Sequence, residues 1–405
     1  MRRPTLLFLA ACVATAAFSQ KMDDGMHRYS LDFTLSAVNF VDTIPIVAEG
    51  DQIYIPVTIN GRQHLFNLDT GSSQGVVYQG GTVAYGLPVG KVNSRDANGR
   101  IDTIPAVRFP TFQLGRLTVS GYTGSLLSRP PGRYPYDAII GFDLFNKGLQ
   151  GKIDLRRKQL ILTDRKDFFA AEPGFVMKYK LKRWVPYVKT NPFLKYKEET
   201  LFDTGSQELY AMNKGAFDRE RFKDVRVANM IEDVEEGQSA IGNYGAERSG
   251  QVIYMQFPEL PWGDFRFLNV HAHTTQGDTR IGTQLLNYGT LVVDPKQKEL
   301  KFQPYPAEEG MAMPLQVEAD NKLADIAYIP TQDGRAMVGL VRRGTPAHAN
   351  GFRQGDIILR INDDAIASFD DFKSYPFVKG RRYVFTLLSA RGFKKEIAVD
   401  NWGIR

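Results

Sequence analysis

One stretch of this chain constrains its fold more than any other, because it occurs twice. Asp69-Thr70-Gly71-Ser72 follows the apolar residues Phe66–Leu68, and Asp203-Thr204-Gly205-Ser206 follows Leu201-Phe202. The two copies are 134 residues apart (203 − 69). At average amino-acid usage a four-residue string does not recur by chance in a chain of this length. The duplication therefore predicts two related halves, each with an acidic turn at the end of a buried strand.

Length and composition set the outer limits. The chain has 405 residues, which suggests about three domains of roughly 100–200 residues each. It is 43% hydrophobic and 24% charged, as in an ordinary globular protein. The net charge of +6 is not gathered into a dense basic tract or an aromatic ladder, so we expect no nucleic-acid partner.

The first residues predict export. Arg2 and Arg3 precede an apolar run that ends near Phe18, and small residues stand where a signal peptidase reads, so residues 1–19 are interpreted as a signal peptide. Leu9-Ala10-Ala11-Cys12 also resembles a bacterial lipoprotein box, which would leave a lipid on Cys12. Cleavage after Ser19 would leave no cysteine and hence no disulfide. We expect a periplasmic or secreted protein, or one anchored at Cys12, with no transmembrane helix.

The body of the chain has a β pattern. Apolar residues alternate from Ile53 to Ile59, Asn60-Gly61 predicts a tight hairpin turn, and later short runs are broken by Gly and Pro. Further segments recur: Ile140–Gly148 aligns with Ile281–Gly289, and Ile153–Leu160 aligns with Val293–Leu300. We therefore expect a mainly β protein with two homologous lobes, residues 20–166 (with an N-terminal arm) and residues 167–305.

Residues 306–405 are expected to form a linker and a third unit. The stretch that ends at Gly310 contains Pro and Glu and is typical of a linker. Strands are predicted at Val338–Val341 and Ile357–Ile361, with Tyr383–Leu388 as the closing strand. Ala347–Asn350 is expected to be a short helix, and Ser368 with Asp371 predicts a second helix start.

The paired turns suit one kind of chemistry. Glycine permits a tight turn and close backbone approach, and Thr and Ser hydroxyls can orient a carboxylate. Two lobes packed about a pseudo-twofold axis would bring Asp69 and Asp203 face to face. Two carboxyls that close share one proton, so one is a base and the other an acid. A water between them could be activated to hydrolyse an amide without a metal or a covalent intermediate.

With these motifs the chain resembles the pepsin- and retropepsin-like aspartic proteases in their single-chain, two-lobed form, over about residues 45–305. Each acidic turn is followed by the family's hydrophobic-hydrophobic-Gly element, Ile139-Ile140-Gly141 and Arg280-Ile281-Gly282, although Arg280 departs from the pattern. The resemblance implies double-ψ-barrel-like lobes around a central cleft, a peptide or protein substrate in extended conformation, and no cofactor. It also implies roles for individual residues. Asp69 and Asp203 would be catalytic, Thr70 and Thr204 would brace the two loops against each other, and Gly71 and Gly205 would support the turns. Ser72 and Ser206 would be hydrogen-bonded to the outer carboxylate oxygens.

The resemblance also implies a β-hairpin flap over the substrate. We expect it at Val92–Ile101, with Ala97, Asn98 and Gly99 at the tip. Pepsin-like flaps carry a tyrosine, and none occurs between Tyr85 and Tyr122. The flap is thus closer to the retroviral or bacterial type, and an ordinary polar hairpin is the alternative.

The C-terminal unit resembles a PDZ domain, with the pattern Val338–Ala347, then Gly351-Phe352 and Gly355–Ile358, although Asp363 stands where Gly is common. PDZ domains add an extended peptide to a sheet edge and often capture a C-terminal carboxylate. No glycine-rich carboxylate loop precedes Val338, so a unit that only braces the protease is equally open.

Other motifs in the chain predict no second functional site. His271 and His273 could form a metal pair, but a partly exposed strand is the favoured interpretation. The acidic run of residues 232–236 is expected to be a solvated loop, a counterpart of the flap in the second lobe. No G-x-S-x-G motif supports a serine nucleophile. Trp184 and Trp262 are expected in the core.

The leading hypothesis is an exported aspartic endopeptidase with a PDZ domain for substrate recruitment or regulation. The rival is a non-catalytic, chaperone-like peptide-binding protein on the same fold. A third possibility is a protease for one defined partner, with the PDZ domain as a docking or autoinhibitory module.

Overall fold

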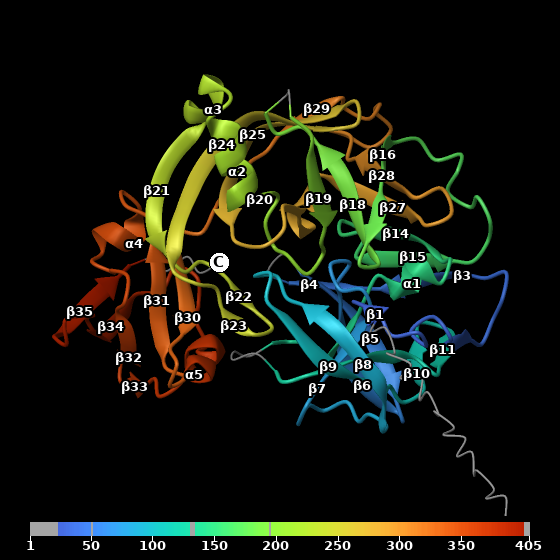
Figure 1. The fold of residues 1–405 in the computed structure, drawn as a ribbon, viewed down its shortest axis with the longest axis horizontal. Helices are drawn as coiled ribbons and strands as arrows, with labels where there is room; N and C mark the ends of the chain where they lie inside the picture. Colours follow the sequence, from blue (N-terminus) through green and yellow to red (C-terminus); the bar gives the residue numbers. More distant parts are fainter. Residues whose placement is uncertain (1–22, 50–51, 130–133, 194–195, 401–405) are drawn as a thin grey trace, which may run out of the picture.

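The structure is a computed structural model that describes residues 23–49, 52–129, 134–193 and 196–400. The expected signal peptide and the alternative lipidation site at Cys12 lie outside the described residues. As predicted, the fold is mainly β, and none of the described helices is long and apolar enough to cross a membrane (Figure 1). The described helices are α1 (Asp143–Asn146), α2 (Lys214–Arg221), α3 (Val225–Ala228), α4 (Pro346–Ala349), α5 (Phe369–Ser374) and the 3-10 helix η1 (Thr283–Asn287).

The first lobe is a twelve-stranded sheet. The predicted hairpin is present: Ile59 pairs with Arg62, and Asn60 and Gly61 have φ angles of 49° and 77°. Its strands are β1 (Asp23–Asp24), β2 (Thr34–Leu35), β4 (Val47–Glu49), β5 (Gln52–Ile59), β6 (Arg62–Leu68), β7 (Gly75–Tyr78), β8 (Pro88–Arg95), β9 (Ile101–Arg108), β10 (Phe112–Leu114), β11 (Leu117–Ser120), β12 (Thr123–Leu127) and β13 (Ala138–Ile140).

The second lobe is a nine-stranded sheet. Its strands are β17 (Lys180–Lys182), β18 (Val185–Thr190), β19 (Glu198–Phe202), β20 (Ala211–Asn213), β21 (Ile231–Gly237), β24 (Gly250–Trp262), β25 (Phe265–Thr275), β26 (Arg280–Ile281) and β29 (Gln316–Glu318). Beside it stands a separate two-stranded hairpin, β22 (Ile241–Gly242) and β23 (Gly245–Ala246).

The repeated motifs occupy equivalent places in the two lobes. In the first lobe β6 leads into Asp69 and runs parallel to β13, and the Asp69 amide donates to Ile140 O at 3.0 Å. In the second lobe β19 leads into Asp203 and runs parallel to β26, and the Asp203 amide donates to Ile281 O at 2.9 Å. Each acidic turn is therefore fixed by a buried two-strand parallel pair.

A six-stranded sheet joins the two halves. It contains β3 (Val41–Pro45), β14 (Gln150–Asp154), β15 (Gln159–Thr163), β16 (Phe175–Lys178), β27 (Gly289–Asp294) and β28 (Glu299–Pro304). The order β16-β28-β27-β14-β15-β3 is symmetric about the β27–β14 pair, so the second repeated segment of each half pairs with its counterpart. One continuous apolar core runs through both halves, and this continuity holds the acidic turns in a fixed relation.

The C-terminal unit has its own sheet and its own core. Ser368 and Asp371 form a reciprocal capping box at the start of α5, as the sequence predicted. The predicted strand Tyr383–Leu388 is present, but a further strand follows it, so it does not close the unit. The strands are β30 (Ile326–Pro330), β31 (Ala336–Val341), β32 (Ile357–Ile361), β33 (Asp364–Ala365), β34 (Tyr383–Leu388) and β35 (Lys394–Val399).

Two expectations about individual segments are wrong. The acidic run of residues 232–236 is not a solvated loop, because it lies in β21 and contacts the C-terminal unit. Trp184 is 44% exposed with a positive φ of 65°, whereas Trp262 is buried as expected. A separate observation is that β29, within residues 306–405, pairs with β25 of the second lobe.

Candidate active site

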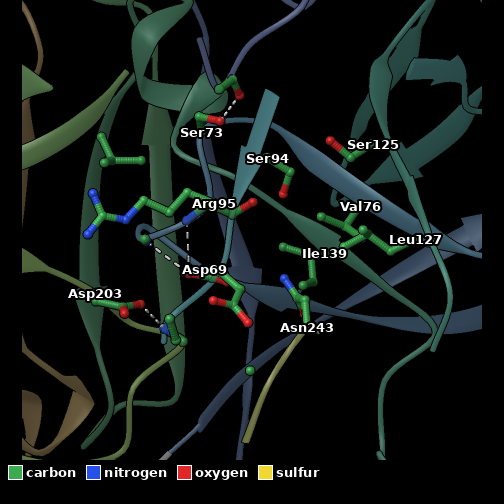
Figure 2. Close-up of a pocket in the computed structure, with 18 of the residues that line it drawn as sticks. Asp69, Ser73, Val76, Ser94, Arg95, Ser125, Leu127, Ile139, Asp203 and Asn243 are labelled. Atoms are coloured by element: carbon green, nitrogen blue, oxygen red, sulfur yellow. Dashed lines mark hydrogen bonds between the residues drawn. The ribbon is translucent and has the colours of Figure 1, made fainter. Parts of the chain in front are cut away.

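The structure brings the two acidic turns together at the floor of a cleft (Figure 2). Glycine is required for this approach. A Cβ atom on Gly71 would lie 2.4 Å from Asp203 Oδ1, and one on Gly205 would lie 2.7 Å from Asp69 Oδ1. Each turn thus places its glycine against the carboxyl group of the opposite lobe, which no larger residue permits.

Two threonines lock the turns to each other. The Thr70 amide donates to Thr204 Oγ1 and the Thr204 amide donates to Thr70 Oγ1, each at 3.0 Å. The hydroxyls in turn donate across the lobe boundary, from Thr70 to Phe202 O at 2.8 Å and from Thr204 to Leu68 O at 2.5 Å. Both threonines are fully buried, so these bonds replace water that the groups cannot reach.

Backbone amides orient the carboxylates. Asp69 Oδ1 accepts from the amides of Gly71 at 2.9 Å and Ser72 at 3.1 Å, and Asp203 Oδ1 accepts from the Gly205 amide at 2.9 Å. The expected serine contacts are wrong: the Ser72 hydroxyl donates to Gln74 O at 2.7 Å, and the Ser206 hydroxyl donates to Glu208. The tight turns already supply donors to the carboxylates, so the hydroxyls are free to brace other groups.

The two carboxyl groups perturb each other. Burial, the charge of Asp203 and a hydrogen bond with Asp203 raise the pKa of Asp69 well above its ordinary value. Burial also raises the pKa of Asp203, but the nearby Arg280 charge and the hydrogen bond from Asp69 oppose this rise. The pair can therefore hold one proton at a pH where separate carboxyls would be ionised, and the surroundings favour that proton on Asp69.

A charged network lies behind Asp203. Arg280, the residue that departs from the family pattern, is only 6% exposed, and its Nε donates to Ser206 Oγ at 3.0 Å. Its Nη2 lies 3.9 Å from Glu208 Oε1, which is also 3.4 Å from His273 Nε2. Although burial opposes it, the charge of Arg280 and the contact with His273 hold the pKa of Glu208 well below its usual range.

Sequence reasoning missed Glu208 and the role of His273. A buried arginine needs an anion, so Arg280 at an apolar position of a strand was the signal that could have found one. The two histidines weighed as a metal pair lie in β25, as expected of a strand, and each contacts a carboxylate. His271 Nδ1 is 3.1 Å from Glu232 Oε1, and His273 contacts Glu208.

The cleft has a volume of about 270 Å³ and two kinds of wall. In Figure 2 the side chains of Val76, Leu127 and Ile139 gather on one side of Asp69. The remaining wall is largely polar and charged, although Val92, Val185, Leu201 and Ile241 also belong to it. Its lining includes Asn93, Ser94, Arg95 and Asp96 from the first lobe, and Arg183, Asn243, Asp278 and Arg280 from the second.

The expected flap is a hairpin of β8 and β9 at the edge of this cleft. Asp96 closes its turn, with the Asp96 amide donating to Arg100 O and the Gly99 amide to Asp96 O, each at 2.9 Å. Val92 to Ala97 line the cleft, whereas Asn98 and Gly99 do not. Asn98 reaches instead to Gly245 O of the second lobe, at 3.1 Å. The lining surface is therefore the β8 strand and Ala97 rather than the whole tip.

The flap is tied to the second lobe. Arg95 Nη2 donates to Asp278 Oδ1 at 3.2 Å, and the other oxygen of Asp278 accepts from Arg183 at 2.8 Å and from Tyr187 OH at 2.7 Å. The carbonyl of Ala97 packs on Gly277, where an added Cβ would lie only 1.8 Å away. These contacts place the flap across the cleft in this structure.

Two family models match parts of this chain. A family model of aspartyl proteases matches residues 55–144, and a PDZ domain model matches residues 313–380. No curated protein matches the chain. Among solved structures, an aspartic proteinase from Irpex lacteus is similar with a TM-score of 0.42 and 11% identity, over 65% of this chain and 97% of its own. The chain therefore combines a segment that matches an aspartyl protease domain with a C-terminal PDZ domain.

Proposed function

We propose that the protein is an aspartic endopeptidase whose catalytic residues are Asp69 and Asp203. The observation that carries this proposal is the coupled pair of carboxyls on opposing turns at the cleft floor, with the pKa of Asp69 raised by burial and by Asp203. A pair that shares one proton supplies an acid and a base at the same place, which amide hydrolysis requires.

The asymmetry of the site assigns the two roles. Arg280 favours a negative charge on Asp203, so Asp203 is the base and Asp69 holds the proton. Asp203 takes a proton from a water molecule while the water oxygen attacks the carbonyl carbon of the substrate. At the same time Asp69 gives its proton to the carbonyl oxygen. When the tetrahedral diol collapses, Asp203 returns its proton to the leaving nitrogen, Asp69 recovers one from a hydroxyl, and the C–N bond breaks.

The proposed substrate is an extended segment of a peptide or protein. Val76, Leu127 and Ile139 offer an apolar surface beside Asp69, and the β8 strand crosses the cleft above it. An extended segment can present side chains to the apolar wall while its backbone lies between the flap and the carboxyls. The described part of the first lobe places no tyrosine between Tyr85 and Tyr122, so the pepsin flap interaction is not part of this proposal.

We further propose that the PDZ domain either recruits substrates or regulates proteolysis. If it recruits substrates, its ligand is a C-terminal peptide. The predicted domain boundaries and export also belong to this proposal: a signal peptide of residues 1–19, lobes of residues 20–166 and 167–305, and a linker with the PDZ domain in residues 306–405. N-terminal sequencing of the protein secreted by its native host separates cleavage after Ser19 from lipid attachment at Cys12.

The test of the main proposal is cleavage of an unstructured peptide mixture, read by mass spectrometry, with wild type and Asp69→Asn side by side. The proposal predicts new peptide termini that appear only with wild type, while both proteins bind peptide. A wild type that binds peptides as Asp69→Asn does and yields no new termini would favour the rival, a non-catalytic peptide-binding protein.

A further inference from the structure

The β22–β23 hairpin stands between two parts of the chain that are distant in sequence. Figure 1 shows it between the PDZ sheet and the strands of the first lobe. It belongs to neither large sheet, and β22 pairs only with β23 among the described strands. Ile241, Gly242 and Asn243 line the cleft, so the hairpin also forms part of the wall that a substrate must pass.

On one side the hairpin holds the tip of the flap. Arg100 donates from Nη1 to Tyr244 O at 2.5 Å and from Nη2 to Ala246 O at 2.7 Å. Asn98 Nδ2 donates to Gly245 O at 3.1 Å, and the Tyr244 amide donates to Asp96 Oδ2 at 3.2 Å. The planar guanidinium of Arg100 thus joins the turn of the hairpin at Tyr244 to β23 at Ala246, which a lysine could not reproduce.

The same side has an apolar contact. The ring of Tyr244 packs against the buried cluster that contains Val92 and Ile104, the inward-facing residues of the flap strands. A tyrosine from the second lobe therefore covers the flap, whose own strands contain none. Flap opening must break this contact together with the four hydrogen bonds.

On its other side the hairpin rests on the PDZ domain. Ile241 packs against the PDZ core, and β23 lies beside β30, the edge strand of the PDZ sheet. At the base of the hairpin the Gln238 amide donates to Gly339 O of β31 at 3.0 Å. The packing is close: a Cβ on Gly339 would lie 2.4 Å from Gln238 O, and one on Gly237 would lie 2.5 Å from Gly339 O.

A buried carboxylate makes the base of the hairpin a defined unit. Glu247 is 2% exposed, and its Oε1 accepts from the Ser239 amide at 2.6 Å, the Ser239 hydroxyl at 2.7 Å and the Ala240 amide at 3.0 Å. The Glu247 amide also donates to Ala240 O at 3.0 Å. Because these bonds hold the base of the hairpin together, a displacement of the base at its contact with Gly339 also displaces the β22–β23 hairpin that contacts the flap.

From these contacts we infer that the β22–β23 hairpin is a latch that holds the flap closed, and that its hold depends on its seat against the PDZ domain. The inference rests on the proposed function, in which the flap covers a peptide in the cleft. By this inference the PDZ domain is physically connected to the active site. Any movement of the PDZ domain away from Gln238 and Ile241 also weakens the hydrogen bonds of the hairpin with Arg100 and Asn98.

The test measures hydrogen exchange of the flap-tip amides, residues 96–100, in the full-length protein, so it does not depend on activity. Two wedge variants each add a Cβ atom that must push apart the contact of the hairpin base with Gly339: Gly339→Ala from the PDZ side and Gly237→Ala from the second lobe. Arg100→Gln removes the grip on the flap directly. Phe393→Ala, at a PDZ side chain that is 70% exposed, is the matched control.

We expect flap-tip exchange to be about tenfold faster in Arg100→Gln and at least about threefold faster in both wedge variants, with the control unchanged. Retained protection in β32 and β34 shows that the PDZ domain itself stays folded. If flap-tip amides exchange at the wild-type rate in both wedge variants but faster in Arg100→Gln, the role of the PDZ domain is overturned. Wild-type exchange in Arg100→Gln would overturn the latch. Loss of proteolysis in every variant, wild type included, would count against the proposed function and leave this readout intact.

Discussion

Thr70 and Thr204 exchange hydrogen bonds symmetrically: each backbone amide donates to the hydroxyl of the other threonine, at 3.0 Å in both directions. The residues are separated by 134 positions in the chain and belong to different lobes (204 − 70). Because each threonine directly follows Asp69 or Asp203, this pair joins the two turns that carry the carboxyls. The proposed sharing of one proton by Asp69 and Asp203 therefore depends on a contact between lobes.

Removal of one of these hydroxyls should destabilise the protein and misalign the dyad. Thr204→Val deprives the Thr70 amide of its acceptor and Leu68 O of its donor, and both groups are buried. Leaving such groups unpaired costs about 1–3 kcal/mol each. We expect a lower thermal unfolding midpoint and a large loss of kcat. Thr204→Ser, which keeps the hydroxyl, should retain most of both. Equal losses in the two variants would contradict a special role of the hydroxyl at this position.

Replacement of Arg280 should change the pH dependence of catalysis. Its positive charge lowers the pKa of Asp203, so Arg280→Leu should raise that pKa and move the acid limb of kcat/KM to higher pH, by about one unit. Arg280→Lys keeps the charge and should keep the acid limb close to the wild-type position. The other charged groups around this position are Asp69, Glu208 and His273.

Arg280→Leu also leaves Glu208 without its partner, and this carboxylate could itself disturb the site. The double variant Arg280→Leu/Glu208→Gln removes both charges and serves as the matched control. If its acid limb still lies above the wild-type position, the shift belongs to the lost arginine. An acid limb that stays in place in all three variants would contradict the assigned role of Arg280.

Asp143 should make the stability of the protein depend on pH. It is fully buried, and burial raises its pKa from 3.8 to about 7, although Tyr122 and backbone amides donate to it. The folded state thus binds this proton more tightly than the unfolded state does. The stabilisation is complete below pH 3.8 and is lost as the pH rises toward 7. Asp143→Asn cannot ionise, so its unfolding midpoint should fall less between pH 4 and pH 7 than that of wild type. Parallel decreases would show that Asp143 does not titrate in this range.

Much of this arrangement follows from local sequence. The Asn60-Gly61 turn, the Ser368 cap and the strands that lead into Asp69 and Asp203 each depend on a few neighbouring residues. The repeat then implied that the two turns meet, because homologous halves pack symmetrically. Sequence also singled out Arg280 as a departure from the apolar pattern.

The remaining features depend on contacts between distant segments, and no local pattern encodes them. The acidic residues of β21 look solvated in sequence, but Arg343 of the PDZ domain donates to Glu235 from its amide at 2.7 Å and from Nε at 2.9 Å. The β22–β23 hairpin has two residues in each strand, too few for an alternating pattern to appear. Trp184 is predicted to lie in the core rather than to form a binding platform, but its positive φ places it on a turn between β17 and β18.

Casein hydrolysis from pH 3 to pH 8 by wild type, Asp69→Asn and Asp203→Asn tests the proposed dyad directly. Two carboxyls that share one proton predict a bell-shaped profile for wild type and loss of activity in both variants, with all three proteins folded. Hydrolysis that persists in either variant, or a folded wild type that cleaves nothing at any pH, would contradict the proposed dyad.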